Sequence, residues 1–291
     1  MSHASPAETA GLTGPAAGTD ARETKRAALY RALRERSSLI VAYSGGVDSA
    51  YLAYAATQVL ADRALCITAD SPSYPAHHRA MAIRLAREFR FHHEIITTAE
   101  IDRAEYRANP ANRCYYCKHE LYTKLTAIGR AQGISAIADG SNADDRGDYR
   151  PGRQAAREFG VWSPLDDVDL TKEEIRELSR AAGLPTWNEP ASACLSSRIP
   201  YFSEVTEEKL RMIERAESVL RDLGFRVCRV RHHDTIARLE FGRDEMPRAI
   251  EPGMADAIDR ALREIGYQHV TIDLRGYRLG SLNDALRLRP V

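Results

Sequence analysis

The sequence predicts an α/β protein in which a parallel sheet carries helices on both faces, followed by a small α+β domain. Short apolar runs alternate with stretches of helical periodicity along the first two thirds of the chain, which is typical of a parallel sheet. That alternation stops near residue 203, where a helical pattern leads into two closely spaced strand patterns. The length of 291 residues allows two domains.

The elements of the first domain follow from these patterns in chain order. Residues 1–22 are small and polar, and we expect a disordered tail because they cannot bury enough apolar surface to offset the entropy of ordering. Helical patterns lie at 24–36, 48–60, 76–89, 115–131 and 171–182, and strand patterns at 39–43, 64–69, 91–96, 134–139 and near 161–162. We place this domain at 23–203, with 185–203 as its connection to the next.

The second domain, 204–291, is expected to contain a hairpin. Its patterns are a helix at 206–223, strands at 226–231 and 236–241, a helix at 253–265 and a strand at 269–274. Alternation puts Arg229 and Arg231 on one face with Arg238 and Glu240. One register sets Arg229 opposite Arg238, and facing like charges are destabilising unless an anion such as a nucleotide phosphate lies between them. An ordinary charged outer face is the alternative.

The composition excludes few classes of function, but together with the N-terminal pattern it predicts the cellular compartment. Lys plus Arg equals Asp plus Glu at 41 each, so net charge gives no argument for binding nucleic acid or membranes. No apolar run is long enough to predict a membrane span, and the N-terminus lacks a secretion-signal pattern. We therefore expect a cytoplasmic protein. Its five cysteines should be reduced, which favours a metal or catalytic role over a disulfide framework.

The segment Ser44-Gly45-Gly46-Val47-Asp48-Ser49 follows an apolar strand pattern and opens a helix. Gly45 and Gly46 have no Cβ, so their backbone amides can approach an anion, towards which the helix points its unpaired N–H groups. Ser44 and Ser49 add hydroxyl donors, and Asp48 is suited to holding Mg²⁺ beside phosphate oxygens. The pattern predicts a phosphate-binding loop. A glycine turn with serine caps is the alternative.

Three cysteines lie in polar segments. Cys114 and Cys117 form C-x-x-C, and Cys194 lies in a loop rich in Pro and Ser. A redox pair, half of a zinc site completed by His119 or another histidine, cluster ligands and three unrelated thiols all remain open. Three thiolates would suit a [4Fe–4S] cluster with one iron left open. The remaining two cysteines, Cys66 and Cys228, are expected in the core.

The phosphate loop resembles that of a known superfamily. The chain lacks G-x-x-x-x-G-K-[ST] and G-x-G-x-x-G, whereas SGGVDS resembles the PP-loop of the N-type ATP pyrophosphatases. This resemblance implies a Rossmann-like sheet of the adenine nucleotide alpha hydrolase kind and cleavage of ATP between its α and β phosphates. The loop residues and Mg²⁺ would clamp the pyrophosphate, and Asp70 and Ser71 at the end of the second strand would contact the nucleoside. A polar strand-end turn is the alternative for that pair.

Four further segments narrow the resemblance to one branch. Together with SGGVDS, the segments NPANRCYYCK, DGSNADDRGDYRPG (139–152), PASACLSSRIPY (190–201) and RVRHHDTIARLE (229–240) make the chain similar to the LarE-type sulfur transferases over nearly all of its length beyond the tail. The resemblance implies that a carboxylate of pyridinium-3,5-biscarboxylate mononucleotide is adenylated and converted to a thiocarboxylate. The product would serve the nickel-pincer nucleotide, the cofactor of lactate racemase.

This family has two sulfur sources. In one form a single cysteine, at or beside the position of Cys194, gives up its own sulfur, and C-x-x-C is absent. Because this chain has Cys114 and Cys117 as well, it resembles the three-cysteine form, in which a [4Fe–4S] cluster delivers sulfide to the acyl-adenylate. The sacrificial cysteine stays open as the alternative.

The resemblance also assigns roles outside the loop. Asp144, Asp145 and Asp148 would place metal or water and Arg150 would meet phosphate, with a solvated turn as the alternative. Arg229, Arg231 and Arg238 would bind the substrate phosphate near a subunit interface, and Glu217 and Glu240 would hold a metal there. The second domain would form a homo-oligomer, a hexamer by this resemblance.

Two other functions are less consistent with the sequence. A PP-loop tRNA thiolase would need a basic stripe or an RNA-binding domain, and neither is evident, so nucleic acid is not an expected partner. An ATP-binding sensor without chemistry would have no use for three thiols near such a loop.

Overall fold

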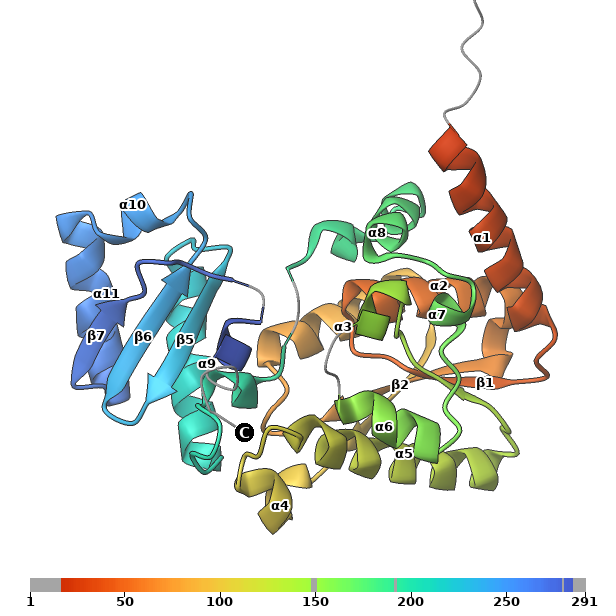
Figure 1. Ribbon diagram of the computed structural model, residues 1–291, viewed down its shortest axis with the longest axis horizontal. Coiled ribbons are helices and arrows are strands. Elements are labelled where there is room, and N and C mark those ends of the chain that lie inside the picture. Colours follow the sequence, from red (N-terminus) through yellow and green to blue (C-terminus); the bar gives the residue numbers. More distant parts are fainter. Residues whose placement is uncertain (1–16, 148–150, 191–192, 279, 285–291) are drawn as a thin grey trace, which may run out of the picture.

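The computed structural model describes residues 17–147, 151–190, 193–278 and 280–284 (Figure 1). Helix α1 spans Ala17–Arg34 and therefore begins earlier than the helical pattern at 24–36. The expected tail is corrected for 17–22, which are helical, while 1–16 lie outside the described residues. In the described part, no helix has the length and apolar character needed to cross a membrane.

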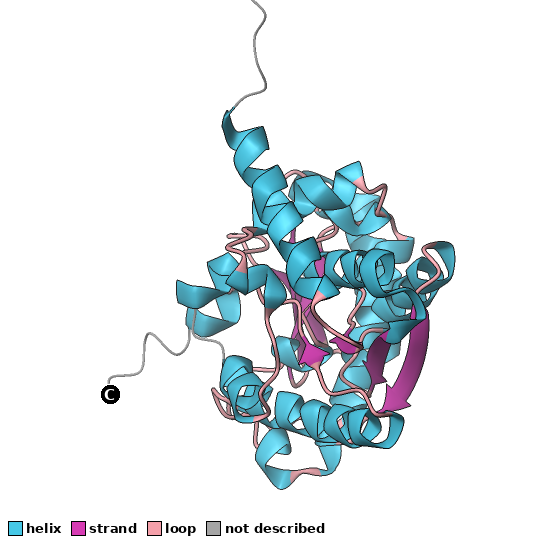
Figure 2. Cartoon of the chain, turned by 90° about the vertical axis from the view of Figure 1, so that its right-hand side faces the viewer, coloured by secondary structure: helices cyan, strands magenta, loops and turns pink. Residues whose placement is uncertain are grey.

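The first sheet is parallel throughout, as expected. It contains β1 (Leu39–Ala42), β2 (Ala64–Asp70), β3 (His92–Thr97) and β4 (Ile137–Ala138), in the order β3-β2-β1-β4. The last strand is shorter than the pattern at 134–139, and Trp162 adds only an isolated parallel bridge to Ala138. Figure 2 shows these strands enclosed between helices. All strand ends that carry polar loops therefore meet at one edge.

Helices cover both faces of this sheet, and β1 explains why. Leu39 and Val41 belong to one buried cluster with residues of α1, α2 (Val47–Leu60), α3 (Ala76–Glu88) and α8 (Lys172–Ala181). Ile40 and Ala42 point to the opposite face, into a cluster with α5 (Arg113–Gln132) and α6 (Pro151–Glu158). A strand buried on both faces reads as a continuous apolar run, which is what 39–43 shows.

Helix α6 was not expected. It begins at Pro151, inside the segment interpreted as an acidic loop, and buries Ala155 and Ala156 against the sheet. Proline is well suited to the first turn of a helix because its missing N–H is not needed there. The short elements of the chain are η1 (Ala61–Arg63), η2 (Glu100–Asp102), α4 (Ala104–Arg107), η3 (Ala143–Gly147), α7 (Pro164–Asp167), η4 (Pro185–Asn188), η5 (Leu195–Arg198), α10 (Met246–Ala249) and η6 (Ser281–Asn283).

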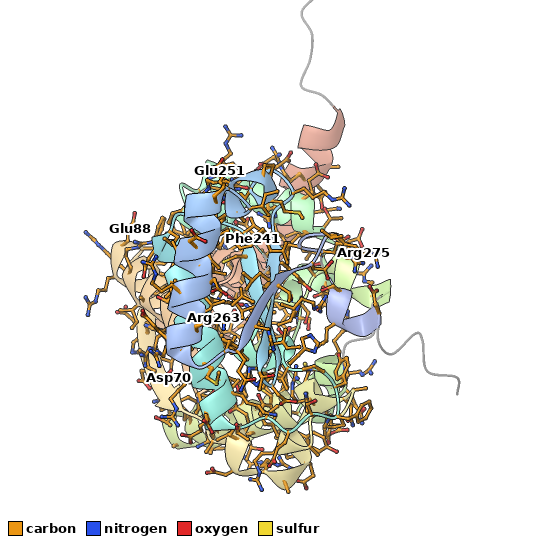
Figure 3. All side chains as sticks on the ribbon, turned by 90° about the vertical axis from the view of Figure 1, so that its left-hand side faces the viewer. Asp70, Glu88, Phe241, Glu251, Arg263 and Arg275 are labelled. Atoms are coloured by element: carbon orange, nitrogen blue, oxygen red, sulfur yellow. The ribbon has the colours of Figure 1, made fainter. Side chains whose placement is uncertain are left out.

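The C-terminal part is a separate sheet with its own core. It contains α9 (Glu207–Asp222), β5 (Cys228–His233), β6 (Ile236–Phe241), α11 (Pro252–Ile265) and β7 (His269–Ile272), and the strand order is β5-β6-β7. The first pair is antiparallel and the second parallel. Figure 3 shows Arg263 on the outer side of α11 and Phe241 deeper in this part, where it is fully buried. The core position expected for Cys228, and that for Cys66 in the first sheet, are confirmed.

The hairpin register differs from the one considered. Arg229 faces Glu240, and it is Arg231 that faces Arg238. The reason lies in the turn, because His233 pairs with Ile236 and only two residues connect the strands. Asp234 takes a positive φ of 53°, a conformation that aspartate tolerates in tight turns. The expected register would have centred the turn one residue earlier.

Candidate active site

The phosphate loop joins the end of β1 to the start of α2. Gly45 has a φ of +69°, and a Cβ there would lie 2.7 Å from the Cβ of Ala82 on α3, so both backbone and packing require glycine. Gly46 is the N-cap of α2 and makes no side-chain cap hydrogen bond. No N-cap side chain therefore accepts a hydrogen bond from the first N–H groups of α2. Helix starts with uncapped N–H groups bind anions.

Hydroxyl groups hold the loop in shape. Ser49 Oγ accepts from the backbone N–H of Ser44 at 3.1 Å, donates to the carbonyl of Gly46 at 3.1 Å, and lies 3.0 Å from Ser44 Oγ. Tyr74 donates from Oη to the carbonyl of Ser44 at 2.8 Å. A Cβ on Gly140, after β4, would lie 2.9 Å from the backbone nitrogen of Ser49. The loop is thus braced from two neighbouring strand ends before any ligand arrives.

Asp48 lies in the first turn of α2 and pairs with Lys172. Its second carboxylate oxygen, Oδ1, is buried and has no hydrogen-bond partner among the described residues. A buried, unpaired carboxylate oxygen next to a phosphate-type loop is a hard ligand of the kind that Mg²⁺ takes. Asp48 therefore fits the role expected of it.

Lys172 escaped the sequence reasoning, although a signal was present. It is the first residue of α8, where the positive end of the helix dipole disfavours a cation. The helix is otherwise well begun, because Thr171 and Glu174 form a capping box. A lysine in that position needs carboxylate partners, and Asp48 supplies one.

Asp70 and Ser71 lie at the end of the second strand, where the sequence placed them, and both have protein partners. Asp70 pairs with Arg79 at 2.5 Å, and Ser71 Oγ donates to Glu100 at 2.6 Å. With Tyr74 and Glu214 they line an open pocket of about 320 Å³ at the end of β2. Since Tyr74 also contacts the phosphate loop, pocket and loop adjoin. Contact with a nucleoside stays a prediction.

The three cysteines come from two segments that meet. Cys114 and Cys117 lie in the first turns of α5, and Cys194 precedes η5. Cys114 is exposed as a residue, but the protein packed around its thiol desolvates it, and this desolvation, followed by the nearby thiol of Cys194, raises the pKa of Cys114. Burial, Glu100 and the other two thiols raise the pKa of Cys117. The three thiols thus influence one another electrostatically. They are three of the four thiolates that an iron–sulfur cluster normally takes.

Their side chains do not form a finished metal site. Over the described ranges, which omit 191–192 just before Cys194, no three His, Cys, Asp or Glu side chains are placed to hold a metal ion. The donor chemistry fits a cluster, whereas the arrangement of the thiols does not yet do so. The [4Fe–4S] cluster stays a prediction.

Two buried residues that the sequence reasoning missed join these segments. The side-chain amide of Asn109 donates to the carbonyls of Pro200 at 2.7 Å and Ser203 at 3.0 Å. Arg113 donates to the carbonyl of Ser196 at 2.9 Å. Both side chains are almost fully buried, and buried polar groups need such partners. Their signal in the sequence was weak, because a buried asparagine or arginine cannot be told from an exposed one without the fold.

A chain of hydroxyl groups ends on the sulfur of Cys194. Ser73 Oγ lies 2.6 Å from Tyr106 Oη, which donates to Ser196 Oγ at 3.0 Å, and Ser196 Oγ lies 3.0 Å from Cys194 Sγ. Each hydroxyl carries one hydrogen. Tyr106 donates its only hydroxyl hydrogen to Ser196. Ser73 must therefore donate to Tyr106, and Ser196 is free to donate to the sulfur of Cys194.

The acidic loop serves the fold where it is described. Asp144 accepts the backbone N–H of Lys172 at 2.8 Å, and Asp145 accepts that of Asn142 at 3.1 Å. Asp148 and Arg150 lie outside the described residues. The metal or water role of this loop is untested.

The arginines of the second domain also have partners. Arg231 donates to Glu240 and to the carbonyl of Ser197, both at 2.8 Å. Arg238 pairs with Asp273 and lies 3.5 Å from Glu240. Arg229 lies over the ring of Tyr277 at 5.1 Å, and burial and the charge of Arg198 lower its pKa. Binding of a substrate phosphate by these three stays a prediction.

Glu217 and Glu240 are buried carboxylates. Glu217 accepts from Arg198 at 2.8 and 3.0 Å and from the backbone N–H of Val230 at 3.1 Å. Burial would raise the pKa of Glu217, but the guanidinium of Arg198 more than offsets this and holds it below its usual value. Both glutamates thus pair with arginines among the described residues, and these contacts do not support a metal between them.

Comparison with known proteins gives three relatives that match nearly the whole chain. A protein from Synechocystis sp. is 41% identical over 264 residues, which cover 91% of this chain and 98% of the relative. The pyridinium-3,5-bisthiocarboxylic acid mononucleotide synthase of Lactiplantibacillus plantarum is 34% identical over 264 residues, covering 90% and 95%. A protein from Methanocaldococcus jannaschii is 28% identical over 244 residues, covering 84% and 92%. No protein-family model matches.

Proposed function

The chain belongs to the LarE-type sulfur transferase family, and from that premise we propose that it converts a carboxylate of pyridinium-3,5-biscarboxylate mononucleotide into a thiocarboxylate for the nickel-pincer nucleotide. The observation that carries the proposal is the match to a synthase of the bisthiocarboxylic acid mononucleotide over 90% of this chain. The braced phosphate loop, with the unpaired oxygen of Asp48, supports ATP as the source of energy.

We propose that the reaction runs in two steps. The N–H groups at the start of α2 bind the β and γ phosphates of ATP, and Asp48 holds Mg²⁺. A carboxylate oxygen of the substrate attacks the α phosphorus, and the bond to the β phosphate breaks with its electron pair leaving on pyrophosphate. A sulfur nucleophile then attacks the acyl carbon of the adenylate, and AMP leaves. Adenylation is needed because oxide is a poor leaving group.

We propose that the three thiols hold the source of the sulfur rather than supply it themselves. Cys114, Cys117 and Cys194 would hold a [4Fe–4S] cluster, which supplies a nucleophilic sulfide when bound. The chain's own contribution is to hold the segment after Cys194 through Arg113 and Asn109, while the hydroxyl chain from Ser73 reaches the sulfur of Cys194. Transfer of the sulfur of Cys194 itself is the alternative. We also propose a homo-oligomer, a hexamer, assembled through the second domain.

The experiment is pyrophosphate release from Mg·ATP by anaerobically purified protein. Release should require the biscarboxylated pyridinium mononucleotide and should not respond to bulk tRNA. Asp48→Ala should lower the rate about a hundredfold or more, because a Mg²⁺ ligand stabilises several kcal/mol of charge in such a step. Retained release in this variant would refute the role of Asp48.

The sulfur source is decided on the same sample. Iron and acid-labile sulfide analysis should detect a cluster, and its content should be unchanged in Asp48→Ala. A colourless, iron-free protein that loses the mass of one sulfur per turnover would establish the sacrificial cysteine instead.

A further inference from the structure

Three buried hydroxyl groups connect the turn after β2 with the sulfur of Cys194. They belong to Ser73, Tyr106 and Ser196, which are 3%, 1% and 0% exposed. We propose that Tyr106 is a positioning residue for sulfur transfer, because its hydroxyl group makes Ser196 hold the Cys194 sulfur in one orientation. This inference rests on the proposed function, and it applies whether Cys194 binds the cluster or gives up its own sulfur.

The hydrogen of Ser196 is directed by Tyr106. Tyr106 Oη donates to Ser196 Oγ at 3.0 Å, so Ser196 accepts on that side and must donate on another. Among the described residues, the other partner of Ser196 Oγ is the sulfur of Cys194, also at 3.0 Å. Ser196 is fully buried, and a buried hydroxyl hydrogen without an acceptor costs free energy. The serine therefore donates to the sulfur.

Loss of the tyrosine hydroxyl group would release this direction. Ser196 Oγ could then accept from the thiol of Cys194 or turn its hydrogen away, because a hydroxyl group and a thiol can each donate and accept. The bond to the sulfur would also lose the polarisation that one hydrogen bond in a chain gives to the next. With Tyr106 in place, a single orientation of the sulfur is favoured.

The turn after β2 also holds the backbone beside Cys194. The carbonyl of Ser73 accepts the backbone N–H of Leu195 at 2.8 Å, and the backbone N–H of Ser73 donates to Ser71 Oγ at 3.2 Å. Ser71 lines the pocket of about 320 Å³ at the end of β2. One turn thus fixes both the sulfur and the pocket, which suits a reaction in which a sulfur nucleophile meets an acyl-adenylate. Misplacing such reactants by about 1 Å can cost about a hundredfold in rate.

Tyr106→Phe separates this role from packing. The ring of Tyr106 lies in a buried cluster with Ile101, Leu195 and Ile199, and phenylalanine keeps that ring. Anaerobically purified protein is given Mg·ATP and the biscarboxylated pyridinium mononucleotide, and the first turnover is followed. The variant should form thiocarboxylate about tenfold more slowly than wild type, because the sulfur is misplaced. Pyrophosphate release in the same turnover should stay close to the wild-type rate, whereas a general structural defect would slow both steps.

A second measurement needs neither substrate nor metal. Iodoacetamide labelling of Cys194 is compared with that of Cys114 in the same reduced, metal-free sample by mass spectrometry. The ratio should rise roughly fivefold in Tyr106→Phe, the factor that corresponds to losing one hydrogen bond, because the sulfur is no longer held towards the buried Ser196. A general loosening of the fold would instead increase labelling of the buried Cys66 and Cys228 as well.

Tyr267→Phe is the matched control. Tyr267 is equally buried, and its hydroxyl group lies 3.0 Å from His232 in the core of the C-terminal part. The control should leave both measurements at their wild-type values. If Tyr106→Phe fails to fold, Ser73→Ala removes the first hydroxyl group of the chain and should change both measurements in the same direction by a smaller factor.

The outcomes separate the inference from the function. A labelling ratio or a rate of thiocarboxylate formation that stays at the wild-type value in the folded variant would overturn the role of Tyr106. If the wild-type protein forms no thiocarboxylate, the proposed function fails, while the labelling ratio still decides whether Tyr106 holds the sulfur of Cys194.

Discussion

His78 is a buried histidine in a positively charged neighbourhood. It lies on α3 with 9% of its surface exposed. Burial lowers its pKa to about 4, with further lowering by His77, Arg229, Arg198 and Arg221. Between pH 6.5 and about pH 4 the imidazole is therefore mostly protonated in the unfolded chain but mostly neutral in the folded protein.

This shift predicts how stability depends on pH. The folded pKa is depressed below the unfolded value of 6.5, so the contribution is fully present above that value and is lost as pH falls towards 4. The loss should reach about 3 kcal/mol. Urea unfolding of wild type and His78→Gln at pH 7.5 and pH 5 checks it. The gap between the two proteins should change by about 2 kcal/mol, because pH 5 is still above the folded pKa of about 4. His92→Gln, at an exposed residue that opens β3, is the control. Equal pH profiles for wild type and His78→Gln would contradict the prediction.

At the scale of an element, the turn into α2 depends on one backbone conformation. Gly45 and Gly133 both have a φ of +69°, but only a Cβ at Gly45 would meet another atom, Ala82 Cβ at 2.7 Å. Gly133→Ala should cost about 1 kcal/mol, the strain of a left-handed alanine. Gly45→Ala should cost about 2–4 kcal/mol, because α3 must also move.

The same pair of variants reports on function. Calorimetric titration with Mg·ATP should show nucleotide binding lost in Gly45→Ala and retained in Gly133→Ala, since only the first reshapes the phosphate loop. Equal stability of the two variants would mean that the approach of α3 does not constrain the loop.

The sequence predicted elements well where the signal is local. Apolar strands buried on both faces and the glycine pair of the loop are read from neighbouring residues, and the structure confirms the parallel sheet and the loop's place. Prediction from the sequence failed for elements whose conformation depends on contacts between residues far apart in the chain. Helix α6 was missed because its burial against α5 and the sheet decides it, and the hairpin register because a single turn residue, Asp234, sets it.

The site was predictable to a similar degree. Ser44, Gly45 and Asp48 lie within five residues of one another in the chain, and their residue types indicate phosphate and metal binding. Lys172 reaches Asp48 only through the packing of α8 beside α2, and Asn109 reaches Pro200 only through the fold. Pairings across about a hundred residues leave no periodicity. The unfavourable place of Lys172 at a helix start indicates that it needs a partner, but not which residue that partner is.

At the scale of the whole molecule, the segment carrying Cys194 is anchored in the C-terminal part. Arg198 donates to the carbonyls of Ala193 and Cys194 and to Glu217 of α9, and Arg231 of β5 donates to the carbonyl of Ser197. In Figure 1 this connection runs from α8 to α9, between the two sheets. The position of Cys194 therefore depends on both parts of the molecule.

Breaking the buried pair of Arg198 and Glu217 should be far more harmful than replacing it. Both side chains are at most 2% exposed. Glu217→Gln leaves a buried guanidinium without its counter-charge, and Arg198→Met leaves a buried carboxylate, so each should lose about 3–5 kcal/mol. The double variant Arg198→Met with Glu217→Leu leaves no buried charge and should recover most of that loss.

Urea unfolding in metal-free buffer measures the cycle. A coupling energy of several kcal/mol between the two positions is expected, because each single variant strands the other charge. If Glu217 instead served chiefly as a metal ligand, Glu217→Gln would be close to neutral without metal and the two substitutions would be nearly additive. Since Arg198 also holds the carbonyl of Cys194, alkylation of Cys194 by iodoacetamide should be faster in Arg198→Met than in wild type, under conditions where both remain folded.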